Sequence, residues 1–311
     1  MADIIKPGAT FVDTDGNVAQ LHGVGIQRLG DRFYAWGENK AAGSTFTAVS
    51  CYSSGDLATW RHEGEALTAA HEGDIGPDRI VERPKVLQHP DGHFVMILHV
   101  DSDDYSFARV GYATADAPEG PFRYVGSERP LGNLSRDIGV FQEDGVGYLL
   151  SEDRDNGLHI YRLAADYLSV ESVVATTLKD DRSHGYESPT VIKYDGLYYL
   201  FGSDLTGWAM NDNKVSTSPS LAGPWSAWSD IAPPGSATFQ SQVSVVVPVE
   251  IGDDTRFVYV GDRWIKDDLK SSPAVVLPIE LGEGEARLLW RDEWALSELA
   301  DLTAQSSRER T

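Results

Sequence analysis

The segment TVIKYDGLYYLFGS, residues 190–203, decides the fold. A β-branched, apolar run ends at Asp195-Gly196, and a strand rich in aromatic residues follows at once. Two such runs joined by a two-residue Asp-Gly turn are typical of a β-hairpin. One acid, Glu187, stands just ahead of this hairpin. A carboxylate at the entrance of an apolar strand raises the question of what that strand does.

The same turn followed by an aromatic strand recurs along the chain. The first Asp of each copy lies at 31, 91, 144, 195 and 254, so the steps are 60, 53, 51 and 59 residues. A recurring period of this length is typical of repeat architectures. The five copies are GDRFYAWGE (30–38), DGHFVMILHV (91–100), DGVGYLLSE (144–152), DGLYYLFGS (195–203) and DTRFVYVGD (254–262).

Each repeat contains about four short strands. An apolar run precedes every turn, and further β-rich segments such as TAVSCYSS (47–54) follow most of the hairpins. Five such units predict an all-β protein: a single five-bladed β-propeller over residues 1–302, with four antiparallel strands per blade. A pair of β-sandwiches is the alternative, but no linker rich in Pro, Gly or Ser divides the chain. Helical periodicity is confined to residues 291–302, and residues 303–311 are predicted to be a polar tail.

The chain is strongly acidic. Its 26 Lys and Arg against 48 Asp and Glu give a net charge of −22. Such a surface repels phosphate backbones and anionic lipids, so neither nucleic acid nor a membrane surface is an expected partner. No window approaches the roughly 18 apolar residues of a membrane helix, and the N-terminus lacks a secretion signal. We expect a monomer that is cytoplasmic, or secreted and supplied without its leader.

Cysteine usage gives no sign of a disulfide or a metal. The single cysteine, Cys51, has no partner for an internal disulfide. No Cys/His spacing is typical of zinc binding, so no metal site is expected. Cys51 is predicted to be a small buried residue.

The five innermost strands of the predicted propeller begin with polar residues. In a propeller these strands line the central channel, so residues at their entrances converge although they are far apart in sequence. Buried, clustered carboxylates repel one another and lose hydration, which indicates a function. The alternative is a structural network in which the acids pair with Arg83, Lys85 and Arg136. The entrance residues are His22, Glu82, Asp137, Glu187 and Gln242.

Three carboxylates around a water-filled funnel suit glycoside hydrolysis. One acid must protonate the leaving oxygen, and an opposing group must activate water or attack carbon. Glu187 is the predicted general acid, because its apolar hairpin gives it the driest surroundings and nearby like charges raise its proton affinity. Asp137 would tune that affinity, and Glu82 would hold sugar hydroxyls.

Aromatic residues in two loops are candidates for stacking on sugar rings. Trp208 and Asn211 follow the Glu187 hairpin in a loop rich in Gly and Asn, and Tyr105 lies in the corresponding loop of the second unit. Sugar C–H faces stack on such rings. The tryptophans of the outer strand segments, Trp60, Trp225 and Trp228, are predicted to be packing residues.

At these residues the sequence resembles glycoside hydrolase family 43, and within it the exo-β-1,3-galactanase branch. The resemblance runs from about residue 10 to 265. Single motifs are moderately specific, but their order and blade positions together make the match strong. They are LHGVGIQRLGDRFYAWGE (21–38), ERPKV (82–86), SRDIGVF (135–141), ESPTV (187–191), TGWAMN (206–211) and SQV (241–243).

The resemblance implies a five-bladed propeller with Glu187 as general acid and Asp137 as its modulator. The wider family places a catalytic base, an Asp, in the first blade, whereas this chain has His22 in that region. The galactanase branch shares this absence, and a Gln of the fifth blade, matched by Gln242, is thought to position or activate the water. An amide is a weak base, so Glu82 is the rival for that role. The branch positions that contact substrate are matched by Glu38 and Thr206.

The expected function is therefore exo-acting hydrolysis of β-1,3-linked galactosyl chains with inversion, without a metal or organic cofactor. A retaining mechanism is disfavoured because the first blade offers no nucleophile. An arabinofuranosidase or galactofuranosidase of the same family is the closest alternative. A non-catalytic sugar-binding propeller is the alternative of another class.

Overall fold

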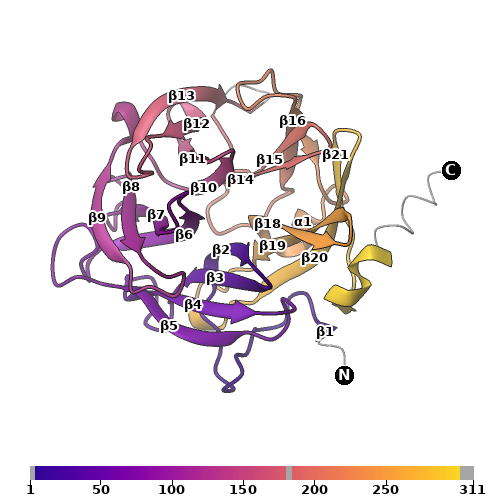
Figure 1. The fold of residues 1–311 in the computed structure, drawn as a ribbon, viewed down its shortest axis with the longest axis horizontal. Coiled ribbons are helices and arrows are strands. Elements are labelled where there is room, and N and C mark those ends of the chain that lie inside the picture. Colours follow the sequence, from indigo (N-terminus) through magenta and orange to yellow (C-terminus); the bar gives the residue numbers. More distant parts are fainter. Residues whose placement is uncertain (1–3, 180–183, 302–311) are drawn as a thin grey trace.

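Five four-stranded antiparallel sheets stand around a common axis in the computed structural model, which describes residues 4–179 and 184–301. Viewed down that axis, the first strand of each sheet lies nearest the centre (Figure 1). Each sheet is built from consecutive strands, so each repeat of the sequence forms one blade. The predicted all-β, five-bladed propeller with four antiparallel strands per blade is confirmed.

The blades follow one another in chain order. The first consists of β2 (His22–Leu29), β3 (Arg32–Glu38), β4 (Ala48–Ser54) and β5 (Arg61–Thr68). The second consists of β6 (Ile80–Gln88), β7 (Phe94–Asp101), β8 (Arg109–Ala115) and β9 (Arg123–Glu128). The third consists of β10 (Ile138–Glu143), β11 (Val146–Asp153), β12 (Gly157–Leu163) and β13 (Val170–Thr177).

The fourth and fifth blades complete the ring. The fourth consists of β14 (Glu187–Tyr194), β15 (Leu197–Ser203), β16 (Lys214–Ser218) and β17 (Ser229–Asp230). The fifth consists of β18 (Gln242–Ile251), β19 (Asp254–Asp262), β20 (Ala274–Gly282) and β21 (Glu285–Leu288). Short helical turns are Pro130–Gly132, Ala237–Gln240 (α1) and Leu269–Ser271.

The hairpin predicted within residues 190–203 forms between β14 and β15. Tyr194 pairs with Leu197, and both Asp195 and Gly196 have positive φ, 48° and 75°, as a tight two-residue hairpin turn requires. Gly196 adopts this conformation at little cost because it has no Cβ.

Alternation along the strands explains why the blades pack on both faces. In β15, Tyr199 and Phe201 pack against the fifth blade, whereas Tyr198 and Leu200 pack against the third. Successive side chains of a strand point to opposite faces, so one aromatic-rich strand contributes to two inter-blade cores. The described residues form five such clusters, one at each junction between neighbouring blades.

Packing residues lie where the sequence predicted them. Trp60 is buried in the core between the first and fifth blades, and Trp225 and Trp228 pack against the core between the third and fourth. Cys51 is fully buried between the first and second blades. Burial raises the pKa of its thiol well above the ordinary value, so Cys51 is an inert apolar residue.

The two ends of the described chain meet beside the ring. β1 (Ile4–Ile5) pairs with β22 (Trp294–Ala295), and Ile5 and Trp294 are buried in the core between the first and fifth blades. The helical pattern of residues 291–302 appears as a 3-10 turn, Leu296–Glu298, followed by helical residues 299–301. The predicted polar tail, 303–311, lies outside the described residues. None of the described helices is long and apolar enough to cross a bilayer.

Candidate active site

A repeated β-bulge shapes the entrance of the innermost strands. The pairing register shifts just after the first residues of β2, β6 and β14, for example between Glu187 and Thr190. The residue at each bulge is left-handed: Gly23, Arg83 and Ser188 have φ of 56°, 51° and 53°. A bulge bends its strand and re-aims side chains, and left-handed non-glycine residues carry strain that clusters at functional sites.

The strand entrances converge on one cavity of about 400 Å³. Seven of the ten predicted site residues line it, which brings together segments from all five blades. The cavity is also lined by residues that the sequence analysis did not assign to the site, among them Lys40, Arg83, Arg154 and Trp264. The seven predicted lining residues are Glu38, Glu82, Tyr105, Asp137, Glu187, Trp208 and Gln242.

Glu187 is the carboxyl of this cavity with the strongest tendency to stay protonated. It is 7% exposed, and its Oε1 accepts a hydrogen bond from Nε2 of Gln242 at 3.0 Å. Burial, and then the charge of Asp137, raise its pKa to about 9. The weak contact of Arg154 with Oε2, at 3.8 Å, does not offset these effects. Glu187 therefore carries a proton at neutral pH.

Glu82 has the opposite electrostatic environment. Its Oε1 accepts a hydrogen bond from the hydroxyl of Tyr105 at 3.1 Å, and its Oε2 lies 3.3 Å from Nδ1 of His99. Burial opposes its ionisation, but His99 and Lys40 outweigh burial and lower the pKa of Glu82 to about 2. His99 is itself held cationic, with its pKa raised to about 9, chiefly by a 2.9 Å contact with Asp101 against the effect of burial. Glu82 is thus ionised and firmly held.

Arg83, which lines the cavity, connects the second blade with the first, third and fifth blades. Its Nε contacts Asp137 at 2.9 Å, its Nη1 lies 3.6 Å from Asp262, and its Nη2 donates a hydrogen bond to Oε1 of Gln242. Its backbone N–H donates to Glu38 at 2.9 Å. Lys40 pairs with the other oxygen of Glu38 at 2.8 Å. The basic neighbours foreseen as a structural alternative are therefore partly present: Arg83 pairs with Asp137, whereas the ion pair that Glu187 makes among the described residues is the longer, 3.8 Å contact with Arg154.

The amide of Gln242 has all its hydrogen-bonding groups in use. Nε2 donates to Glu187 and to Ser203, and Oε1 accepts from Arg83 and from Nε1 of Trp264. The turn α1 just before it is left-handed at four consecutive non-glycine residues, with φ between 48° and 58°. Such a turn is costly for L-residues, so the tertiary structure must enforce it.

Glu152 is a site residue that the sequence analysis missed. It is 1% exposed, and within the described part of the chain neither carboxylate oxygen has a hydrogen-bond partner. Its backbone N–H donates to the carbonyl of Asp137, and Nε of Arg154 lies 3.7 Å from Oε1. Burial, and then Asp137, raise its pKa to about 7, and its charge contributes to the raised pKa of Glu187.

A feature of the sequence that points to Glu152 is the polar residue near the end of the second strand in each blade. These residues pair with the strand entrances, and they are polar in every repeat. The residues are Glu38, His99, Glu152, Ser203 and Asp262, which lie opposite or next to His22, Glu82, Asp137, Glu187 and Gln242. Because the entrance residues were taken from the first strand of each hairpin, His99, Glu152, Ser203 and Asp262 were not predicted, and Glu38 was assigned only through the family resemblance.

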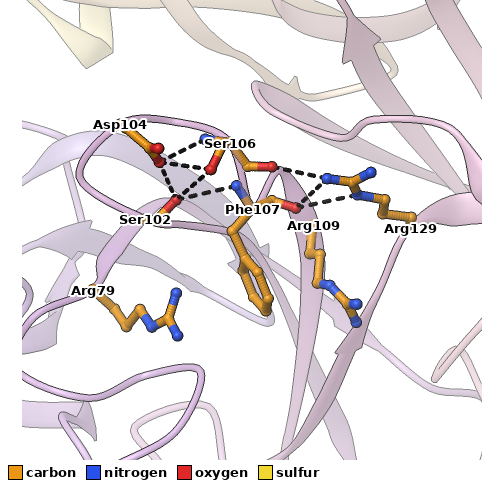
Figure 2. A pocket seen from close by; sticks show the side chains of 7 residues that line it. All are labelled: Arg79, Ser102, Asp104, Ser106, Phe107, Arg109 and Arg129. Atoms are coloured by element: carbon orange, nitrogen blue, oxygen red, sulfur yellow. Dashed lines mark hydrogen bonds between the residues drawn. The ribbon is translucent and has the colours of Figure 1, made fainter.

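Tyr105 is held over the cavity by a tightly bonded loop. Figure 2 shows a second hollow that this loop lines, where Asp104 accepts hydrogen bonds from Ser102 and Ser106, and Arg129 donates to the carbonyls of Ser106 and Phe107. The Phe107 ring lies between the guanidinium groups of Arg79 and Arg109, 4.7 and 4.6 Å from its centre. The hollow they line is separate from the catalytic cavity except for Asp104, which borders both.

Two tryptophans form one wall of the cavity. Trp208 is 49% exposed and meets Trp264 edge to face, with ring centres 6.1 Å apart. His22 stacks on Trp264 at 5.2 Å and is buried. Burial, and then Lys40, lower the pKa of His22 to about 3, so it is neutral. His22 therefore supports the wall and does not line the cavity.

Thr206 and Asn211 shape the loop that carries Trp208. The Asn211 amide donates to the hydroxyl of Thr206 and to the carbonyl of Asp204, both at 2.8 Å. Neither residue lines the cavity. The described residues contain one three-residue group of metal-binding type, His89, Asp91 and His93, and it lies outside this cavity.

Comparison with known proteins agrees with this architecture. The chain is similar over 92% of its length, at 50% identity and a TM-score of 0.90, to a provisionally assigned exo-β-1,3-galactanase from Bifidobacterium bifidum s17, of which it covers 97%. It is 38% identical over 94% of its length, with a TM-score of 0.89, to the Phanerochaete chrysosporium exo-β-1,3-galactanase solved with β-1,3-galactotriose, covering 68% of that chain.

The exo-β-1,3-galactanase of Clostridium thermocellum is 34% identical over 94% of the chain, which covers 66% of that protein, with a TM-score of 0.88. No curated protein sequence matches significantly. The model of the glycosyl hydrolases family 43 matches residues 21–241. With that match over most of the propeller, the chain belongs to glycosyl hydrolases family 43.

Proposed function

We propose that the protein is an exo-acting, inverting glycosidase that releases galactose from β-1,3-linked galactosyl chains. The observation that carries this proposal is the buried Glu187, whose pKa is raised to about 9, in a cavity of about 400 Å³ that Trp208 and Trp264 also line. The galactanases to which the chain is similar support β-1,3-galactan as substrate.

Glu187 is the proposed general acid. Its raised pKa keeps the proton available, and proton donation to the leaving glycosidic oxygen needs a protonated carboxyl at working pH. Asp137 and Glu152 maintain that state through their negative charge. Asp137, fixed by Arg83, also offers an acceptor for sugar hydroxyls.

Water activation is assigned to Glu82, with Gln242 as a positioning residue. The amide of Gln242 is too weak a base in its ordinary tautomer, and it contacts Glu187 directly. Inverting enzymes place acid and base about 6.5–9.5 Å apart, on opposite sides of the sugar. Glu82 is an ionised carboxylate, with its pKa lowered to about 2, and a carboxylate accepts a proton more readily than a neutral amide does. Glu38, Tyr105 and Trp208 are proposed to bind the sugar.

The test is hydrolysis of β-1,3-galactan, with the released sugar identified and its anomeric form followed by NMR. We expect galactose, first as the α-anomer, because inversion converts a β-linkage into an α-product. Aryl arabinofuranosides and galactofuranosides are assayed beside it. Release of arabinose without galactose would overturn the substrate assignment. Galactan binding without hydrolysis would favour a non-catalytic propeller.

A further inference from the structure

The turn between β6 and β7 carries a second cluster of chemically active side chains, His89, Asp91 and His93. Their ligand atoms, one from each residue, all lie within 4.8 Å of one another. Glu82 lies near the start of β6 and His89 follows its end. At about 3.3 Å per strand residue, the cluster is about 20 Å from the catalytic carboxylates, at the opposite end of the channel.

Hydrogen bonds fix which nitrogen of His89 carries the proton. Nε2 lies 2.8 Å from the carbonyl oxygen of Ala165, which can only accept, so Nε2 must donate. Nδ1 accepts from the backbone N–H of Asp91 at 3.3 Å, so in neutral His89 it presents a lone pair. Metal-binding histidines commonly donate their other N–H to a backbone carbonyl in this way.

The lone pair of His89 faces a carboxylate. Nδ1 of His89 lies 2.9 Å from Oδ1 of Asp91, and Nδ1 of His93 lies 2.5 Å from the same oxygen. Two acceptors at 2.9 Å repel unless a positive charge lies between them. Either a proton on His89 or a metal cation supplies that charge. One oxygen of Asp91 lies close to the Nδ1 atoms of both histidines, so a single cation placed among them would contact all three side chains.

We propose that His89, Asp91 and His93 bind one divalent transition-metal ion of the zinc type. Two imidazole nitrogens and one carboxylate oxygen form a donor set that zinc accepts, and water completes a tetrahedral shell. Ligand atoms of such a shell lie about 3.3 Å apart, so the group needs only small side-chain movements. The sequence analysis expected no metal site, because it considered Cys/His spacings and not this His-x-Asp-x-His turn.

The ion would connect the second and third blades. His89 already contacts the third blade through Ala165 and through an edge-to-face contact with Tyr167 at 4.9 Å. Holding His89 by metal coordination would fix this turn against the turn between β12 and β13. The site is therefore structural, and the catalytic rate does not depend on it.

The experiment is calorimetric titration of tag-free, EDTA-treated full-length protein with ZnCl₂, with the melting temperature followed in parallel. We expect one equivalent of zinc to bind and the melting temperature to rise to a plateau, because a ligand that binds the folded state stabilises it. The variants His93→Gln and Asp91→Asn should bind zinc roughly tenfold more weakly or worse. His62→Gln removes a comparable partly exposed histidine, 3.8 Å from Glu65, and should leave binding unchanged.

Three outcomes of the zinc titration would overturn the proposal: no saturable binding by the parent, unchanged binding in both cluster variants, or equal loss in His62→Gln. Circular dichroism of each variant confirms that a loss of binding is not a loss of fold. NMR of the His89 ring, followed first against pH and then against added zinc, distinguishes a proton from a metal ion as the positive charge beside Asp91. A resonance that titrates with pH but does not respond to zinc would assign the charge to a proton and reject the metal site.

Discussion

Nε2 of Gln242 donates a hydrogen bond to Oε1 of Glu187 at 3.0 Å, joining the first strand of the fifth blade to that of the fourth. The two residues are 55 positions apart, and each opens an innermost strand. The contact satisfies one oxygen of a buried carboxyl without neutralising a charge there. It is therefore compatible with a protonated Glu187, as acid catalysis requires.

Replacing Glu187 by Gln should lower galactan hydrolysis by about 10²–10⁴-fold, the usual contribution of a general acid. The loss should be smaller on an aryl galactoside whose leaving group departs without protonation. Comparing kcat on the two substrates checks this. A variant that keeps the parent rate on galactan, or loses both activities equally, would contradict the assignment.

Replacing Glu152 by Gln should move the alkaline limb of the pH–rate profile to lower pH. The negative charge of Glu152 raises the pKa of Glu187, so removing it lets Glu187 ionise earlier. The measurement is kcat/KM against pH for the parent and the variant. The control is Glu65→Gln, which removes a carboxylate outside the cavity and should leave the limb in place. An unmoved limb in Glu152→Gln would show that Glu152 is only structural.

The roles of Glu82 and Gln242 can be separated by comparing Glu82→Gln with Gln242→Ala. If Glu82 accepts the proton from water, its variant should lose about as much kcat as Glu187→Gln, roughly 10²–10⁴-fold. Gln242→Ala should lose less, because it removes a positioning contact. The reverse order, with Gln242→Ala the more severe, would assign water activation to the amide.

Trp208→Ala should raise KM for galactan about three- to tenfold and leave the melting temperature unchanged. Its ring is half exposed, so it contributes little to the core, and aromatic stacking is worth about 0.5–1.5 kcal/mol. Trp290→Ala is the matched control, since Trp290 is 39% exposed and does not line the cavity. If both variants raise KM equally, Trp208 is not a sugar platform.

Much of this site could be predicted because the repeat fixes the geometry. Once the Asp-Gly hairpins are aligned, Glu82, Asp137 and Glu187 must lie at equivalent strand entrances, and the structure places all three in one cavity. Glu152 was not predicted, because it lies in the second strand of its hairpin and the alignment used the first. The sequence also cannot show that a carboxylate is buried without hydrogen bonds. Contacts that cross between blades, such as Arg83 with Asp137, depend on side-chain reach and not on any spacing.

The electrostatic cost of Glu187 should be visible in the stability of the protein. Its folded-state pKa, about 9, lies above the unfolded value near 4.5, so above pH 4.5 the folded protein binds more protons than the unfolded chain. The free energy of unfolding therefore falls as pH rises from 4.5 towards 9, through this group.

Glu187→Gln removes the titration while keeping the shape of the side chain. The variant should be more stable than the parent at pH 8, and this advantage should shrink towards pH 5. Urea unfolding of both proteins at the two pH values measures the difference in the free energy of unfolding. The other titrating groups are common to both proteins. A stability advantage that does not depend on pH would therefore mean that Glu187 is already ionised in the folded state.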